Sequence, residues 1–301
     1  MRAIVTGGAG FIGSHLVDAL LARGDQVWVV DNLASGKREN VPAEAGFFEH
    51  DIRDPVVGDL LRDLQPEACF HLAAQADVVT SVERPEYDAE VNVLGTIALL
   101  RAAGTATQLV FSSSGGAIYG ECERPAREDN PLRPLSPYGT SKLAGEEYIR
   151  TWNRLYGTRH SVLRFANVYG ARQETGLEGG VVAIFLERMA SGAETFIYGD
   201  GRQVRDFVYV GDVVQAVLTA AGRPAGTYNV GSGTPTAIGE LHTLCRWTSG
   251  SERPPTMAPP RPGDLMRSVV DPSLAERELG WRAETSLEQG LKATWAWLVG
   301  G

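Results

Sequence analysis

The sequence predicts an α/β protein built on a doubly wound parallel sheet, with a smaller, loop-rich α/β lobe beside it. Two observations predict the sheet. Short β-branched runs alternate with helical patterns through the first third of the chain, and a glycine-rich turn separates the first run from the first helix. The second lobe is predicted by a change beyond Asn167, where glycines and prolines become denser and apolar runs shorten.

The expected elements alternate along the first lobe, and the strand at 161–166 is expected to close the sheet. In the helix at 85–103, Val91, Leu94 and Ala98 fall at three- and four-residue steps and predict one apolar stripe. A strand and helix at 206–221 are expected to return to the first lobe. We therefore expect a first lobe of residues 1–166 and 206–228 and a second of 167–205 and 229–301. The expected strands are 2–6, 26–30, 68–72, 108–112 and 161–166, and the expected helices are 11–23, 56–64, 85–103 and 141–156.

Composition excludes several classes of protein. The chain has 301 residues and a formal net charge of −9, which does not suit binding to nucleic acid or to an anionic membrane, because both favour basic surfaces. The three cysteines are widely spaced, so we expect neither a disulfide framework nor a metal site. No apolar run reaches the about 18 residues of a membrane span. We expect a soluble protein in the reducing cytoplasm.

The turn after the first strand reads TGGAGFIG, with glycines at positions 7, 8, 10 and 13. Glycines permit a tight turn and close approach of a pyrophosphate, and the N-terminus of the following helix offers N–H groups to it. Asp31 lies eighteen residues beyond Gly13, where a carboxylate binds the ribose hydroxyls of NAD and repels the 2′-phosphate of NADP. The alternative is a turn without ligand, in which Asp31 caps the next loop. Together the two features predict that the first lobe is a Rossmann-type domain that binds NAD.

A second group of polar residues follows the strand at 108–112. The serines at 112, 113 and 114 stand at the edge of the sheet where ligands bind. Tyr138 and Lys142 are four residues apart and share one helix face. A lysine ammonium near a phenol lowers the pKa of the phenol, and a serine hydroxyl can hold the substrate oxygen whose proton the phenolate removes. A surface helical pair is the alternative for an isolated Tyr-x-x-x-Lys.

These motifs together resemble the extended short-chain dehydrogenase/reductases, in the branch of NAD-dependent sugar-nucleotide epimerases and dehydratases, and most closely the UDP-glucose (UDP-galactose) 4-epimerases. The resemblance spans essentially the whole chain and rests on TGGAGFIGSH, VVDNLASG, HLAAQ, EVNVLGT and SPYGTSK. It implies that the following residues bind NAD: Gly7, Gly10, Phe11, Ile12, Gly13, Asp31, Asn32, Asp51, Ile52, Leu72, Ala73, Ala74, Gln75, Asn92, Ser112, Tyr138, Lys142 and Phe165.

The resemblance also implies a catalytic trio of Ser114, Tyr138 and Lys142. One departure affects the serine: the loop reads SSSGGAIYG, with two glycines, where the best-known epimerases read SSSATVYG. The extra residue leaves the register of Ser113 against Ser114 open. We prefer Ser114, which directly precedes the glycines.

On the substrate side, RFANVYG, DGRQVRDF and RPGD resemble the segments that hold a nucleoside diphosphate sugar. Arg205 and Arg261 are implied to bind the diphosphate, which their guanidinium forks match, and Asp264 the ribose. We interpret Arg202 as a surface group. The implied substrate residues are Ser114, Tyr138, Asn167, Val181, Tyr198, Arg205, Arg261 and Asp264.

The resemblance predicts NAD-dependent epimerisation at C4 of a UDP-sugar, UDP-glucose and UDP-galactose first, through a transient 4-keto sugar. One alternative is a UDP-glucuronate or UDP-pentose 4-epimerase. For UDP-glucuronate, Arg172 would meet the substrate carboxylate; the other interpretation of Arg172 is that it caps its loop. A dehydratase is disfavoured because Gly115 and Gly116 stand where those relatives carry acidic residues. A non-catalytic NAD-sensing protein would not need the trio. By analogy with the family, we expect a homodimer through the helix at 85–103 and the helix that carries Tyr138.

Overall fold

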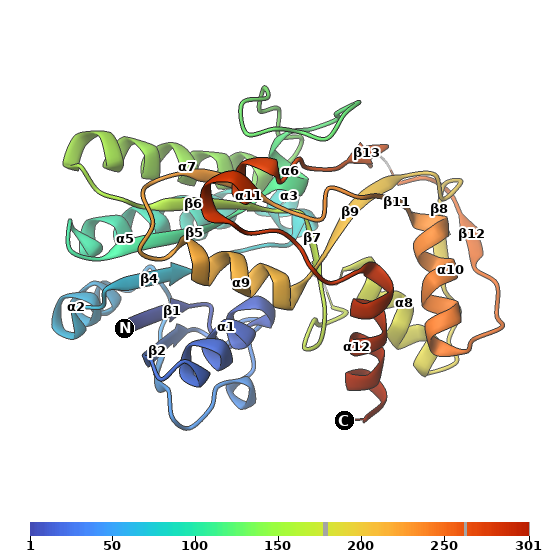
Figure 1. Cartoon of the computed structure of the whole chain (residues 1–301), viewed down its shortest axis with the longest axis horizontal. Helices are drawn as coiled ribbons and strands as arrows, with labels where there is room; N and C mark the ends of the chain where they lie inside the picture. Colours follow the sequence, from blue (N-terminus) through green and yellow to red (C-terminus); the bar gives the residue numbers. More distant parts are fainter. Residues whose placement is uncertain (177–179, 262–263, 301) are drawn as a thin grey trace.

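A computed structural model describes residues 1–176, 180–261 and 264–300. Its main feature is a sheet of seven parallel strands in the order β10-β6-β5-β4-β1-β2-β3. This confirms the expected doubly wound sheet. Figure 1 labels its strands β1, β2, β4, β5 and β6. Strand β1 has β2 on one side and β4 on the other. The chain therefore adds strands first on one side of β1 and then on the other, and ligands bind at such a switch point of a parallel sheet. The strands are β1 (Arg2–Thr6), β2 (Gln26–Asp31), β3 (Gly46–Glu49), β4 (Ala68–His71), β5 (Gln108–Ser114), β6 (Ser161–Phe165) and β10 (Thr227–Val230).

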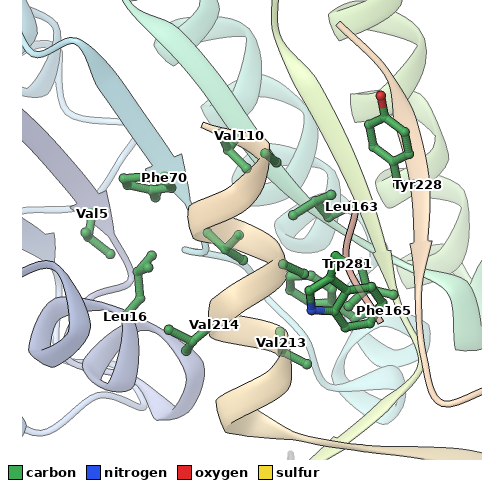
Figure 2. Close-up of a cluster of buried hydrophobic side chains, with 14 of the residues drawn as sticks. Val5, Leu16, Phe70, Val110, Leu163, Phe165, Val213, Val214, Tyr228 and Trp281 are labelled. Atoms are coloured by element: carbon green, nitrogen blue, oxygen red, sulfur yellow. The ribbon is translucent and has the colours of Figure 1, made fainter. Parts of the chain in front are cut away.

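Helices cover both faces of this sheet, because successive strand residues point to opposite faces and both sets are apolar. Val5 belongs to the core beneath α1 and α9, whereas its neighbour Ile4 belongs to the core beneath α2 and α5. Figure 2 shows Val213 and Val214 of α9 between Leu16 of α1 and Trp281. The helices are α1 (Phe11–Ala22), α9 (Val210–Ala220) and α11 (Ser273–Leu279) on the first face, and α2 (Pro55–Leu64), α5 (Gly95–Ala103) and α7 (Pro137–Tyr156) on the second.

The second lobe has its own core, enclosed by three helices at the right of Figure 1. Strand β9 pairs with β7, β11 and β13, and β8 pairs with β12. The elements are β7 (Asn167–Tyr169), α8 (Val181–Ala190), β8 (Phe196–Tyr198), β9 (Val204–Tyr209), β11 (Pro235–Ala237), α10 (Ile238–Ser249), β12 (Thr256–Ala258), β13 (Arg267–Ser268) and α12 (Leu287–Gly300).

The edges of the sheet differ from expectation. The strand at 161–166 does not close it, because β10 pairs with β6 beyond it, and β3 forms the other edge. The segment at 206–221 is divided between the two lobes: β9 pairs with the short strands of the second lobe, whereas Val208 of β9 and the helix α9 belong to the core of the large sheet. The expected boundary at 228 falls inside β10, and Ala275, Leu279 and Trp281 lie in the core of the large sheet.

The long helix at 85–103 is helical throughout but changes pitch. It consists of α4 (Pro85–Ala89), a π-helical segment η2 (Glu90–Leu94) and α5. Its buried face carries Val91, Asn92 and Leu99, whereas Leu94 and Ala98 are exposed, so the expected apolar stripe is wrong. The buried face is set by packing against α2 and α7, which a count of apolar spacings does not reveal.

Helix α7 begins at Pro137 and not at 141. The N–H of Gly139 donates to Ser136 Oγ (3.1 Å), which caps the helix, and proline suits its first position. Tyr138 therefore lies in the first turn. The remaining helical segments are η1 (Arg38–Asn40), α3 (Val78–Glu83) and α6 (Gly115–Ile118). Across the described ranges, no helix combines the length and apolar character needed to cross a bilayer.

Candidate active site

The glycine turn connects β1 to α1 and presses against the segment that follows β4. Gly7 has a φ of +73°, and a Cβ there would lie 2.5 Å from the nitrogen of Ala73. A Cβ on Gly13 would lie 2.0 Å from the carbonyl oxygen of Gly7. No acidic residue lies in the first turn of α1, and Gly10 at its N-cap has no side chain to bind the first N–H groups. The turn therefore fits a pyrophosphate, which needs close backbone approach and free N–H donors.

Asp31 ends β2 beside this turn and is buried. It accepts hydrogen bonds from the N–H groups of Ala9 (2.9 Å) and Leu33 (2.8 Å). Burial raises the pKa of Asp31, and the two N–H bonds oppose that rise. The carboxylate thus caps the next loop and holds the glycine turn, and its position at the end of β2 also suits a ribose.

The residues expected to contact adenine lie after β3. Asp51 accepts hydrogen bonds from Asn32 (3.0 Å) and from Nε and Nη2 of Arg53 (2.8 and 2.9 Å), and the Arg53 bonds lower the pKa of Asp51. Ile52 is buried, and its side chain packs against Gly95 of α5. An adenine contact at Ile52 would therefore involve its backbone.

The segment after β4 is anchored by a buried asparagine. Asn92 Oδ1 accepts from the N–H of Gln75 (2.9 Å), and Asn92 Nδ2 donates to the carbonyl oxygen of Gln75 (2.8 Å) and to Ser141 Oγ (3.0 Å). Asn92 lies in the π-helical segment, a feature that is frequent at functional sites. It joins the Leu72–Gln75 segment to the helix that carries Tyr138 and Lys142.

His71, at the end of β4, is a structural residue. Its ring lies between the hydroxyls of Thr6 (2.8 Å) and Thr96 (3.1 Å). Burial, with a smaller effect of Lys142, lowers the pKa of His71 to about 3, so its ring is neutral at working pH.

The three serines of β5 have different partners. Ser112 donates to the carbonyl oxygen of His71 (3.0 Å), and Ser113 is buried and donates to Glu146 (2.6 Å). Ser114 is half-buried at the start of α6. A Cβ placed on Gly116 would lie 3.9 Å from Ser114 Oγ and 3.8 Å from Asn167 Oδ1, so these two side chains flank the same small space.

Tyr138 and Lys142 lie in the first two turns of α7 and face the end of β5. Lys142 is buried and donates from Nζ to the carbonyl oxygen of Ser112 (3.0 Å). The same Nζ is 6.0 Å from the centre of the Tyr138 ring and 5.1 Å from that of Phe111. The structure therefore brings the lysine, the tyrosine and the serine run together. Phe165 lies next to them, since it pairs with Ser114 at the end of β6.

The expected substrate residues lie at the junction of the lobes and in the second lobe. Arg205 Nη2 forms an ion pair with Asp264, and Arg205 Nη1 donates to the carbonyl oxygen of Leu265 (2.7 Å). The guanidinium of Arg261 stacks on Tyr198, 3.9 Å from the ring centre. Val181 is the first residue of α8 and is partly buried in the second core. In RPGD, Pro262 and Gly263 lie outside the described residues.

The sequence analysis did not predict a buried ion pair between Glu146 and Arg164, next to Ser113. Glu146 of α7 is fully buried and binds Ser113 and Arg164 of β6. The available signal was Arg164 itself, because an arginine inside the apolar strand SVLRF needs a buried partner.

Three comparisons with known proteins agree with this geometry. The sequence profile of the NAD dependent epimerase/dehydratase family matches residues 3–231. The chain is 45% identical over 305 residues to a UDP-glucose 4-epimerase of Mycolicibacterium smegmatis, covering 98% of this chain and 97% of the other.

Two solved structures are similar along the whole chain. A UDP-glucose 4-epimerase from Thermotoga maritima, crystallised with UDP-glucose, has a TM-score of 0.97 and 45% identity, covering 100% of this chain and 99% of the other. One from Thermus thermophilus, in complex with NAD, has a TM-score of 0.94 and 46% identity, with full coverage of both chains. On its glycine turn, its sheet and these matches, the chain belongs to the NAD dependent epimerase/dehydratase family.

Proposed function

We propose that this protein is an NAD-dependent UDP-sugar 4-epimerase that interconverts UDP-glucose and UDP-galactose in the cytoplasm. The observation that carries the proposal is the convergence of Tyr138, Lys142 and the end of β5 beside the glycine turn and the Leu72–Gln75 segment. NAD in this position supplies reversible oxidation at C4 of the sugar. The relatives named UDP-glucose 4-epimerase support the same reading over nearly the full chain.

In this mechanism Tyr138 transfers the proton, and Lys142 stabilises the negative charge of the Tyr138 phenolate. The buried ammonium of Lys142 stands near the Tyr138 ring and favours the phenolate, which takes the proton of the C4 hydroxyl. Ser114 binds the same sugar oxygen. With NAD bound as the two-electron acceptor, loss of this proton together with the C4 hydride would give a 4-keto sugar, still held by its nucleotide. The keto sugar would turn over, and return of the hydride to its other face, with the proton from Tyr138, would complete the inversion. Because the nucleotide part of the substrate supplies most of the binding energy, the hexose itself can be bound loosely enough to turn over in the site.

We assign the hydroxyl to Ser114 and not to Ser113. Ser113 is 3% exposed, and its hydroxyl already donates to the buried carboxylate of Glu146. Ser114 stands next to the space flanked by Asn167 and Gly116. Of the substrate-side residues, we assign Arg205 and Arg261 to the diphosphate and Asp264 to the ribose. We propose that the lobe of the large sheet binds NAD, through the residues between Gly7 and Phe165 that the resemblance implies, and that the second lobe binds the nucleotide sugar. All of β10 and the segment from Ala275 to Trp281 belong with the first of these lobes.

Two alternatives lose support from specific contacts. Arg172 pairs with Asp18 of α1 at 2.8 Å, so it already has a carboxylate within the chain and is less suited to a UDP-glucuronate carboxylate. A dehydratase needs an acid beside the catalytic hydroxyl, and neither Gly115 nor Gly116 supplies one. At Gly115 a side chain would also be crowded, because its Cβ would lie 2.9 Å from Val270.

The test is turnover of a panel of UDP-sugars by purified protein without added cofactor. We expect UDP-galactose and UDP-glucose to interconvert fastest, ahead of UDP-glucuronate and the UDP-pentoses, with epimers separated by chromatography. Bound NAD with no turnover of any UDP-sugar would instead favour the NAD-sensing alternative.

We also propose a homodimer through α3, η2 and α7. Val79 (58% exposed), Val82 (62%) and Leu94 (58%) give this side of the molecule an apolar character, and α3 and η2 both pack on α7. Val82→Glu is expected to convert the dimer to a monomer, measured by sedimentation equilibrium. Val299→Glu on α12, where the valine is 56% exposed, is the matched control and should stay dimeric. A wild-type protein that sediments as a monomer would contradict the proposal.

A further inference from the structure

The carboxylate of Glu146 on α7 binds the middle serine of β5. Ser113, between Ser112 and Ser114, donates to Glu146 Oε1 at 2.6 Å, and the two side chains are 3% and 0% exposed. Glu146 lies one helical turn after Lys142 on α7. The same helix therefore binds β5 twice: Lys142 takes the carbonyl oxygen of Ser112, and Glu146 takes the hydroxyl of Ser113.

Arg164 extends this contact to the neighbouring strand. It is 1% exposed and donates from Nε to Glu146 Oε1 (3.0 Å) and from Nη2 to Glu146 Oε2 (2.7 Å). Burial alone would lower the pKa of Arg164, but its bonds to Glu146 outweigh burial and raise it, so the guanidinium stays charged.

A tyrosine connects the pair to the edge of the sheet. Arg164 Nη1 donates to the hydroxyl of Tyr119 (2.7 Å), and Tyr119 donates to Asn229 Oδ1 (2.7 Å) on β10. Tyr119 directly follows α6, the short helix that begins after Ser114. The buried network of Ser113, Glu146, Arg164 and Tyr119 thus fixes the chain just before Ser114, at Ser113, and shortly after it, at Tyr119.

Stability alone is a poor reason for such a network, because a buried ion pair often contributes no more than apolar residues of the same volume. Its members hold β5, α6, α7 and β6 in one arrangement instead. We infer that Glu146 and Arg164 are positioning residues for the 4-epimerase reaction: through Ser113 and Tyr119 they fix Ser114 relative to Tyr138 and Lys142. This inference rests on the proposed function, and it assigns these residues no contact with substrate.

Two substitutions weaken the network without leaving a buried charge unpaired. Ser113→Ala removes one bond to Glu146, and Tyr119→Phe removes one acceptor of Arg164; the Glu146–Arg164 pair survives both. Because a misplacement of about 1 Å can cost about 100-fold in rate, we expect kcat for UDP-galactose to fall roughly 10- to 100-fold in each variant. We expect KM to change little, since no nucleotide contact is touched. The midpoint of thermal unfolding should fall modestly, and more in Tyr119→Phe, because that variant also removes the donor to buried Asn229 Oδ1.

The control is Arg150→Ala. Arg150 binds the same carboxylate from the solvent side and is 27% exposed, so its loss should leave kcat at the wild-type value. Wild-type kcat in either Ser113→Ala or Tyr119→Phe would overturn the inference. So would a loss of activity that only follows the loss of folded protein or a rise in KM.

These outcomes also separate the inference from the proposed function. A wild-type protein that turns over no UDP-sugar defeats the proposed function, whereas an active wild type with fully active variants defeats only the positioning role. A loss confined to Ser113→Ala, with Tyr119→Phe unaffected, would make Ser113 itself the catalytic hydroxyl.

Discussion

Replacing Tyr138 by phenylalanine is expected to lower kcat for UDP-galactose by roughly 10²- to 10⁴-fold, the usual contribution of a positioned acid–base group. The substitution removes only the phenolic oxygen. It leaves the ring, its packing and the bond from Lys142 to Ser112 in place. The amount of NAD that copurifies should therefore stay at the wild-type level, measured from the nucleotide released on denaturation.

The matched control for this variant is Tyr156→Phe, at the other end of the same helix and 56% exposed. It should retain wild-type kcat. Near-normal epimerisation by Tyr138→Phe would exclude the phenolate as the base, whatever the behaviour of the control.

Replacing Gly13 by alanine is expected to remove most of the bound NAD. The new Cβ would lie 2.0 Å from the carbonyl oxygen of Gly7, and both atoms belong to the backbone of one tight turn. Relief of such an overlap costs about 1–3 kcal/mol, so NAD affinity should fall by about 5- to 150-fold. Calorimetric titration of NAD into protein stripped of its nucleotide measures this change.

Gly58→Ala provides the comparison, because it makes the same chemical change within a helix. A Cβ there meets Arg62 at 3.5 Å and Ala102 at 3.6 Å, which are ordinary contacts. We expect stability to rise by about 0.5–1 kcal/mol and NAD affinity to stay unchanged. If Gly13→Ala binds NAD as tightly as this control does, the glycine turn is not the pyrophosphate site.

The parts of this site that are predictable from sequence are those encoded locally. The glycine turn lies between one strand and one helix, and Tyr138 and Lys142 share a helix face by their spacing alone. The alternation of strands and helices predicts the parallel sheet in the same way, because a parallel connection requires a crossover.

The parts that sequence reasoning missed depend on contacts between distant segments. Strand β10 has four residues and gains its place only by pairing with β6, so its edge position has no local signal. Glu146 and Arg164 are eighteen residues apart on a helix and a strand, and only the packing of α7 on the sheet brings them together. The resemblance to the family predicted that Arg205 and Asp264 bind substrate, but only the structure shows that the two side chains form an ion pair.

The most direct test of the account follows the hydrogen at C4. Purified protein, with no cofactor added, is incubated with UDP-galactose that carries deuterium at C4 of the hexose, and the UDP-glucose formed is examined by mass spectrometry and NMR. The account predicts that the product keeps deuterium at C4 with inverted configuration. Product that has exchanged this deuterium for solvent hydrogen, or no inversion at all, would contradict it.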